Sequence, residues 1–226
     1  MKRVCFLLFS VFYGLTCLAQ KNNLTVKEFA GILEKTEHPQ IIDARSPEEF
    51  ARNRIKGAIN IRVTDSLDIE TVVRKLNPNV PVFTYSINSG RGEILAAKLR
   101  EAGMKEVYAL PGGLANWVGS GYPLETSIAD DSALTGGQFR QIVESGKWVL
   151  VDFGSSYCGG CRRLIPVLDA LKKEYPETLK IVKIELDENP EIIREQKIEA
   201  LPTLVLFKQG KPVWKHKGFI DETELS

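Results

Sequence analysis

The chain of 226 residues is poor in histidine and cysteine and has almost no net charge. Two histidines and four cysteines leave few ligands for structural zinc, which needs about four. A formal charge of +1 gives no broad attraction to nucleic acid or anionic lipid. Beyond the first twenty residues, no apolar run is long enough to span a bilayer. We therefore expect no metal, no cofactor, no nucleic-acid partner and no membrane span in the mature chain.

Residues 1–19 have the layout of a secretory signal peptide. A cationic start, MKR, precedes the apolar run VCFLLFSVFYGLTCLA, which ends in the small-x-small exit of Cys17 and Ala19. We expect cleavage after Ala19 and a periplasmic or secreted protein. The alternatives are a retained anchor and lipid attachment at Cys17. Gly14 stands where lipoprotein signals usually have leucine, which argues against lipid attachment.

Cleavage after Ala19 would leave the mature chain with only two cysteines, Cys158 and Cys161. An exported protein with a structural disulfide framework normally shows several spaced pairs. A single pair separated by two residues instead indicates cysteines that serve reactivity.

The rest of the chain predicts two α/β domains, at residues 20–126 and 127–226. In the first, helices are expected in TVKEFAGILEK, SPEEFARN, DIETVVRKL, EILAAKLREAG and GGLANWVGSG, and strands in QIIDA, PVFTY and EVYAL. This alternation predicts a parallel sheet flanked by helices. Ser46 and Pro47 have the identities expected at the N-cap and first position of a helix.

A polar stretch without periodicity, ETSIADDSALTGG, places a linker near residues 125–132. After it, strands are expected in WVLVDF, LKIVKIEL, TLVLF and PVWKHKGF, and helices in PEIIREQK and in CRRLIPVLDALKKEY, which Pro166 interrupts. The last segment, DETEL, has the spacing of a capping box that starts a helix. We expect this last helix to be truncated and one sheet face to be incompletely covered.

The segment CGGC places Cys158 where a strand runs into a helix. A helix N-terminus stabilises a thiolate, which is the attacking form of the thiol. Cys161 lies one helical turn further on, so it can attack a mixed disulfide formed at Cys158 and release the product. Gly159 and Gly160 add no side chain that would shield the attacking sulfur. This spacing predicts a redox-active disulfide between Cys158 and Cys161.

The segments VLVDFGSSYCGGC, IVKIELDENPEI and ALPTLVLFKQGKPV resemble the thioredoxin family over residues 134–226. The resemblance implies that Asp152 is the buried acid of proton transfer at the second cysteine, with Lys183 nearby. It implies that Pro202 is the cis-proline that faces the sulfurs, beside whose preceding residue substrate backbone pairs. It also implies protein disulfide or dithiol substrates and a membrane-bound or soluble thiol electron donor.

Three residue choices depart from this family. Tyr157 and Gly160 replace the tryptophan and proline of the usual Trp-Cys-Gly-Pro-Cys, so the family's redox potential does not carry over. Gly154 replaces an aromatic residue near the site. Whether the pair works as reductant, oxidant or isomerase stays open.

Two other uses of CGGC are disfavoured. For zinc, His38 and His216 have no zinc-like spacing relative to the cysteines. A copper carrier would use a similar motif, but ALPTL and Asp152 fit exchange chemistry better. An acid in an otherwise apolar strand is costly to bury without a role.

Residues 24–124 resemble the rhodanese-like domains through IIDARSPEEFARNRIKGAINI, LPGGLANWVGSGYPL and the active-loop segment YSINSGRG. Ser86 stands where that family has its persulfide-forming cysteine, and a hydroxyl cannot carry a transferable persulfide. We expect no sulfurtransferase activity. One interpretation is a folded spacer or docking module. The other is an anion-binding loop of backbone N–H groups and a guanidinium, formed by Ser86, Asn88, Ser89, Gly90 and Arg91.

The sequence therefore predicts an exported thiol–disulfide oxidoreductase with an inactive rhodanese-like domain. The alternative is an adaptor protein whose rhodanese-like domain recruits a partner, with secondary redox chemistry.

Overall fold

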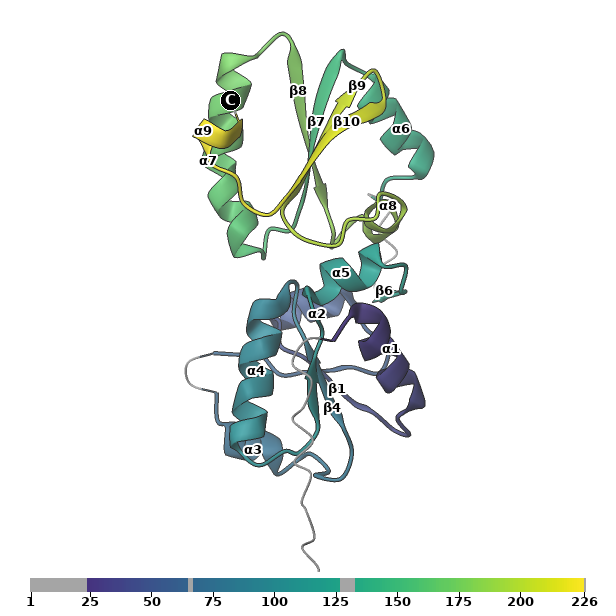
Figure 1. Cartoon of the computed structure of the whole chain (residues 1–226), viewed down its shortest axis with the longest axis vertical. Coiled ribbons are helices and arrows are strands. Elements are labelled where there is room, and N and C mark those ends of the chain that lie inside the picture. The colour runs from purple at the N-terminus through teal and green to yellow at the C-terminus, as the bar shows by residue number, and fades with distance from the viewer. Residues whose placement is uncertain (1–23, 65–66, 127–132, 226) are drawn as a thin grey trace, which may run out of the picture.

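The computed structural model describes residues 24–64, 67–126 and 133–225. Within these residues the chain forms two α/β domains stacked end to end (Figure 1). The predicted signal peptide and most of the predicted linker lie outside the described residues.

The N-terminal domain is built on a four-stranded sheet of order β3-β1-β4-β5, in which every pairing is parallel, as predicted. Its elements are α1 (Val26–Lys35), β1 (Gln40–Asp43), α2 (Pro47–Arg52), β2 (Asn53–Arg54), β3 (Ile59–Asn60), α3 (Ile69–Val73), β4 (Val82–Tyr85), α4 (Ser89–Glu101), β5 (Val107–Ala109), α5 (Gly113–Gly119) and β6 (Glu125–Thr126). Helices α1 and α5 cover one face, where Phe29 packs edge-on against Phe83 and Trp117. Helices α3 and α4 cover the other face (Figure 1).

Local sequence signals set the starts of the first two helices. Ser46 caps α2 in a reciprocal capping box with Glu49, and Pro47 occupies the first turn, as predicted. Thr25 and Glu28 form the same box at α1. These side chains satisfy backbone N–H groups that the helix itself leaves without partners.

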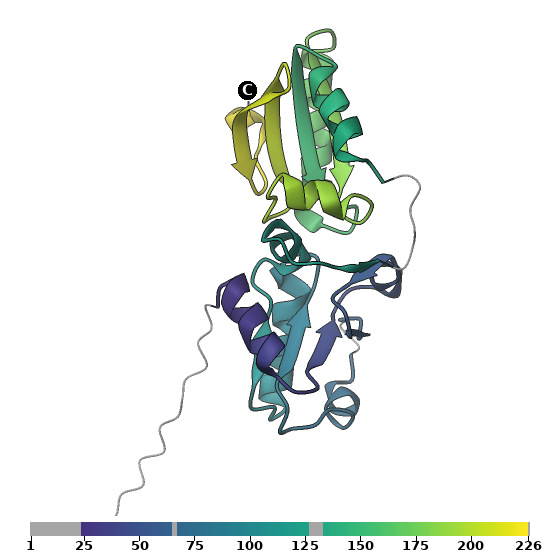
Figure 2. The ribbon, with the colours of Figure 1, turned by 90° about the vertical axis from the view of Figure 1, so that its right-hand side faces the viewer.

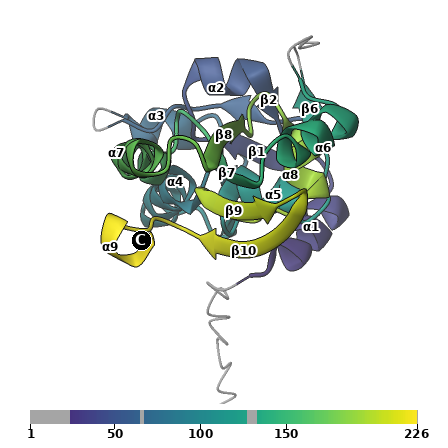
Figure 3. The same cartoon turned by 90° about the horizontal axis from the view of Figure 1, so that it is seen from above.

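The C-terminal domain has a mixed sheet of order β10-β9-β7-β8, in which β7 and β8 are parallel and the other pairs antiparallel. Its elements are α6 (Gly136–Glu144), β7 (Trp148–Gly154), α7 (Gly159–Glu174), β8 (Leu179–Glu185), α8 (Pro190–Glu195), β9 (Thr203–Lys208), β10 (Lys211–Lys217) and α9 (Glu222–Leu225). Helices α6 and α8 pack on one face, and α7 and α9 on the other (Figures 1 and 3).

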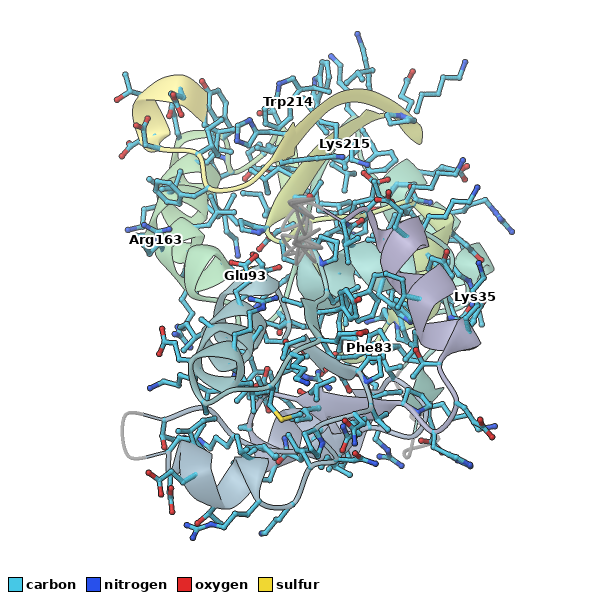
Figure 4. All side chains as sticks on the ribbon, turned by 60° about the horizontal axis from the view of Figure 1, so that its bottom comes forward. Lys35, Phe83, Glu93, Arg163, Trp214 and Lys215 are labelled. Atoms are coloured by element: carbon cyan, nitrogen blue, oxygen red, sulfur yellow. The ribbon has the colours of Figure 1, made fainter. Side chains whose placement is uncertain are left out.

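The face of the sheet that carries α9 also has a groove. Beside this four-residue helix, a groove of about 660 Å³ is lined mainly by apolar side chains, among them Leu150, Leu171 and Leu206. Trp214 lies at the rim, on the edge strand β10 (Figure 4), and 37% of it is exposed.

Four details differ from the sequence prediction. Helix α6, which Thr135 and Gln138 cap, was not predicted, because its first residues are glycines. Helix α4 begins at Ser89, inside the predicted loop. Helix α7 runs through Pro166 as one element. Residues 125 and 126, assigned to the linker, pair with β2.

The two domains meet through α5 and α8, which lie one above the other in Figures 1 and 2. The backbones approach closely at the end of α5, where a Cβ added to Gly119 would lie 2.2 Å from the carbonyl oxygen of Ile198. Residue 119 must therefore be glycine for the domains to meet in this arrangement.

A buried charge cluster also joins the domains. The guanidinium of Arg45 lies 2.7 Å from Asp43 and 3.7 Å from Asp187 of the C-terminal domain. The Asn53 amide donates to the Asp187 carbonyl at 3.3 Å, and the Ser155 hydroxyl donates to the Asp187 carboxylate at 2.7 Å. Burial raises the pKa of Asp187, which the hydrogen bond from Ser155 and the charge of Arg45 oppose. The domain orientation is thus held by paired, buried polar groups as well as by apolar contact.

Among the helices of residues 24–64, 67–126 and 133–225, none has the length and hydropathy needed to cross a membrane.

Candidate functional site

Cys158 lies at the N-cap of α7, directly after the turn that follows β7. Its sulfur accepts the backbone N–H of Cys161 at 3.3 Å. Cysteine here takes the position usually held by serine, threonine, aspartate or asparagine, whose oxygen accepts the same kind of N–H. A negative sulfur accepts such a bond better than a neutral one, so the helix end favours the thiolate.

The two cysteines are free thiols that interact with each other. The pKa of Cys158 is lowered to about 6, first because the Cys161 thiol hydrogen-bonds to its sulfur. Burial opposes the shift, and the N–H groups of Cys161 and Gly160 and the amide of Asn88 add to it. The pKa of Cys161 is raised above its ordinary range, because its proton is held by Cys158 and the thiol is buried. One thiol is therefore ready to attack while the other keeps its proton.

Asp152 lies on β7, two residues before Gly154, and it is 3% exposed. Burial raises the pKa of this carboxyl to about 6, against the charge of Lys183. A Cβ added to Gly154 would lie 3.5 Å from the Cys161 sulfur and 3.6 Å from Asp152 Oδ1. The absence of a side chain at residue 154 thus leaves open space beside both groups. Oδ1 has no hydrogen-bond partner among the described residues.

Lys183 lies beside Asp152 in the sheet, whereas the segment that contains Pro202 lies beside the Cys158 sulfur. Lys183 pairs with Asp152 in the register of β7 and β8, and its ammonium lies 2.5 Å from Glu185. The peptide bond between Leu201 and Pro202 is cis. The Cys158 sulfur lies 3.7 Å from the Leu201 carbonyl oxygen.

A contact from the other domain completes the site. The amide of Asn88 donates to the Cys158 sulfur at 3.4 Å and to the Leu201 carbonyl at 3.1 Å. Asn88 is the N-cap residue of α4, yet its side chain makes no bond to that helix. The sequence pointed to Asn88 only as part of an anion loop, because a contact across 70 residues leaves no local pattern.

Helix α5 holds the loop that carries Asn88. The N–H groups of Leu114 and Ala115 donate to the carbonyls of Ser86 and Ile87, at 2.9 and 3.3 Å. Gly113 has a φ of +64°, and a Cβ there would lie within 2.5 Å of the carbonyl oxygens of Ser86 and Asn88. Glycine at position 113, the first residue of α5, therefore lets the loop pass close to this helix while Asn88 reaches Cys158.

This cover changes one expectation from the sequence. Gly159 and Gly160 were predicted to leave the attacking sulfur unshielded. In the structure, Cys158 is only 1% exposed and Cys161 only 2%. Asn88 of the N-terminal domain contacts the Cys158 sulfur, as do Cys161 and Leu201 of the C-terminal domain.

The predicted anion loop is closed by its own hydrogen bonds. The Ser86 hydroxyl donates to the Asn88 carbonyl and accepts the Gly92 N–H. The guanidinium of Arg91 makes two bonds to the Glu49 carboxylate, at 2.6 and 2.7 Å. Ser89 and Gly90 form the first turn of α4. An anion would have to displace Glu49 from Arg91, and anion binding by this loop stays a prediction.

The described residues contain no group of three or more histidine, cysteine or acidic side chains placed to hold a metal ion.

An acidic thiol at a helix N-terminus, a second thiol one turn later and a cis-proline beside them define a thiol–disulfide oxidoreductase. The family model for thioredoxin matches residues 131–226, and the model for the rhodanese-like domain matches residues 25–120.

Two thioredoxins of similar sequence support this class. Thioredoxin 1 of Synechococcus elongatus is 38% identical over 96 residues, which are 42% of this chain and 90% of that protein. Thioredoxin of Porphyra purpurea is 43% identical over 95 residues, 42% of this chain and 89% of that protein. A solved mutant thioredoxin from Halobacterium salinarum aligns with a TM-score of 0.37 at 31% identity, over 41% of this chain and 80% of that one. The chain belongs to the thioredoxin family through its C-terminal domain, and it carries a rhodanese-like domain before it.

Proposed function

We propose that the protein exchanges disulfides with polypeptide clients in the periplasm or another exported compartment, with Cys158 as nucleophile and Cys161 as resolving thiol. The observation that carries the proposal is the place of Cys158 at the N-cap of α7, where its sulfur accepts the Cys161 N–H and the two thiols shift each other's pKa in opposite directions. The location rests on the signal-peptide pattern of residues 1–19.

The reaction starts from the dithiol. The Cys158 thiolate attacks one sulfur of a client disulfide, which forms a mixed disulfide and releases the other client sulfur as thiolate. The Cys161 sulfur, after losing its proton, then attacks the Cys158 sulfur. This step forms the disulfide between Cys158 and Cys161 and releases the second client thiolate. The client gains two electrons, and an external thiol donor must supply two more to reduce the Cys158–Cys161 disulfide, becoming oxidised itself.

Asp152 is the proposed proton acceptor for the second step. Cys161 holds its proton tightly, so its attack needs a base nearby. The carboxyl of Asp152, with a pKa raised to about 6 by burial, exchanges protons near neutral pH. Both groups face the space beside Gly154, where an added Cβ would lie 3.5 Å from the Cys161 sulfur and 3.6 Å from Asp152 Oδ1. Lys183 lies next to Asp152 in the sheet and lowers the pKa of that carboxyl, opposing burial.

Turnover of a protein disulfide tests the proposal. The wild type should accelerate the reduction of insulin by dithiothreitol. With Cys158→Ser the rate should not exceed that of dithiothreitol alone. Cys161→Ser should form the mixed disulfide with the client and fail to release it, which mass spectrometry detects. Equal rates for the wild type and Cys158→Ser would contradict the proposal.

The adaptor function is the second candidate, and Ser86, whose hydroxyl cannot carry a transferable persulfide, favours a binding role for the rhodanese-like domain over sulfur transfer. Capture of a partner by the full chain should then be lost in Arg91→Ala and retained in Cys158→Ser. Partner capture that depends on Cys158 would instead point to ordinary client binding.

A further inference from the structure

The Asn88 amide lies between two hydrogen-bond acceptors of the other domain. The sulfur of Cys158 and the carbonyl oxygen of Leu201 are 3.7 Å apart, and the amide donates to both. The Leu201 carbonyl can only accept, so the NH₂ end of the amide must face it. Both amide hydrogens are therefore committed to the C-terminal domain.

This commitment has a local cost at α4. Asparagine is among the best N-cap residues, because its side-chain oxygen accepts a backbone N–H of the first turn. Asn88 occupies the N-cap of α4 and makes no such bond. The backbone of Gly113 packs closely against the carbonyls of Ser86 and Asn88, and this contact holds the Asn88 loop beside the Cys158 sulfur. The arrangement thus favours contact with the reactive thiol over support of its own helix.

A client must occupy the place beside Cys158 and Leu201 that the Asn88 amide now fills. A client sulfur reacts only when it reaches bonding distance of the Cys158 sulfur, which Asn88 now covers. The backbone N–H of a client cysteine lies a few bonds from its sulfur. The Leu201 carbonyl, 3.7 Å from Cys158, is therefore within reach of that N–H. Asn88 and an extended client segment therefore compete for the space beside these two acceptors.

We propose that Asn88 is a functional residue of the exchange reaction, a built-in competitor that holds the place of the client on Cys158 and Leu201. The inference rests on the proposed disulfide exchange. A polypeptide client replaces both bonds, one through its reacting sulfur and one through its backbone N–H. The rhodanese-like domain thereby sets how readily the dithiol reacts.

Two variants test the proposal in the full chain by different routes. Asn88→Ala removes the competitor and leaves α4 its present hydrogen bonds, since this side chain caps nothing. Gly119→Ala acts at a distance, because its Cβ would lie 2.2 Å from the Ile198 carbonyl and so push the domains apart. Gly31→Ala is the matched control, since a Cβ there meets nothing within 4 Å.

The assay is insulin reduction at pH 8.5, where the Cys158 thiolate is formed even if loss of one hydrogen bond raises its pKa. Both Asn88→Ala and Gly119→Ala should raise kcat/KM by about tenfold, the equivalent of ~1.4 kcal/mol, which is the net contribution of about one hydrogen bond. Gly31→Ala should match the wild type. Unchanged or slower reduction by both variants, with activity still dependent on Cys158, would overturn the proposal.

Alkylation of Cys158 by iodoacetamide separates this inference from the proposed function. If neither the wild type nor any variant reduces insulin, but Asn88→Ala is alkylated faster than the wild type, the proposed function is wrong and the masking of Cys158 by Asn88 is confirmed. If insulin is not reduced and the alkylation rate is also unchanged in Asn88→Ala, the proposed function and the masking are both wrong.

Discussion

The acidity of Cys158 should appear as a pH dependence of stability. Folding lowers the pKa of this thiol from 9.0 to about 6. Because the folded pKa is the lower one, the stabilisation is fully present above pH 9 and is lost as pH falls through about 6. At ~1.36 kcal/mol per unit, the reduced protein should gain about 1.4 kcal/mol between pH 5 and pH 7, and about 2.7 kcal/mol by pH 8.

The measurement is urea unfolding of the reduced protein at these pH values, compared with Cys158→Ser. Both proteins carry Trp117→Phe, so that the remaining tryptophans, Trp148 and Trp214, report on the C-terminal domain alone. Subtracting the free energy of unfolding of Cys158→Ser from that of the reduced protein at each pH removes the contribution of other titrating groups. The same pH slope in both proteins would refute a thiolate stabilised by the fold. As a second readout, the alkylation rate of Cys158 should rise with a midpoint near pH 6.

Three further predictions follow from the packing around the site. Asp152→Asn should slow client release at pH 7 by roughly 10²-fold, the range typical of a lost proton acceptor, while attack by Cys158 persists; unchanged single-turnover release would contradict this. Gly113→Ala should cost about 1–3 kcal/mol in thermal stability, because residue 113 has a positive φ and faces two carbonyl oxygens; an unchanged Tm would show that the loop yields. Asp43→Ala should destabilise the N-terminal domain by about 3–5 kcal/mol in urea, because it leaves Arg45 buried without its nearest carboxylate; a loss below about 0.5 kcal/mol would mean that Asp187 or water replaces it.

Much of the fold was predictable because short-range patterns determine it. Continuous apolar runs marked β4 and β7, and the Ser46–Pro47 pair marked the start of α2. The two chemical groups at the centre of the site, Cys158 and Cys161, followed from their spacing at a strand-to-helix junction.

What escaped prediction depends on contacts between distant segments. Helix α6 starts with two glycines, which are poor helix formers, and it is held by the packing of Phe139 and Val143 on the sheet. The burial of Cys158 depends on how two domains are placed, and no pattern along either domain states that placement. The pairing of Arg91 with Glu49 likewise joins residues 42 positions apart.

The hydrogen bonds from α5 to residues 86–88 position Asn88, and they thereby link the backbone of the N-terminal domain to the thiol chemistry of the C-terminal domain. A shift of a few tenths of an ångström at Gly113 would move a donor away from a sulfur that belongs to a separate sheet. The N-terminal domain has no cysteine at position 86, but through Asn88 it can therefore adjust the pKa of the Cys158 thiol in the C-terminal domain. Substitutions far from CGGC that move Asn88 would then change the pKa of the Cys158 thiol.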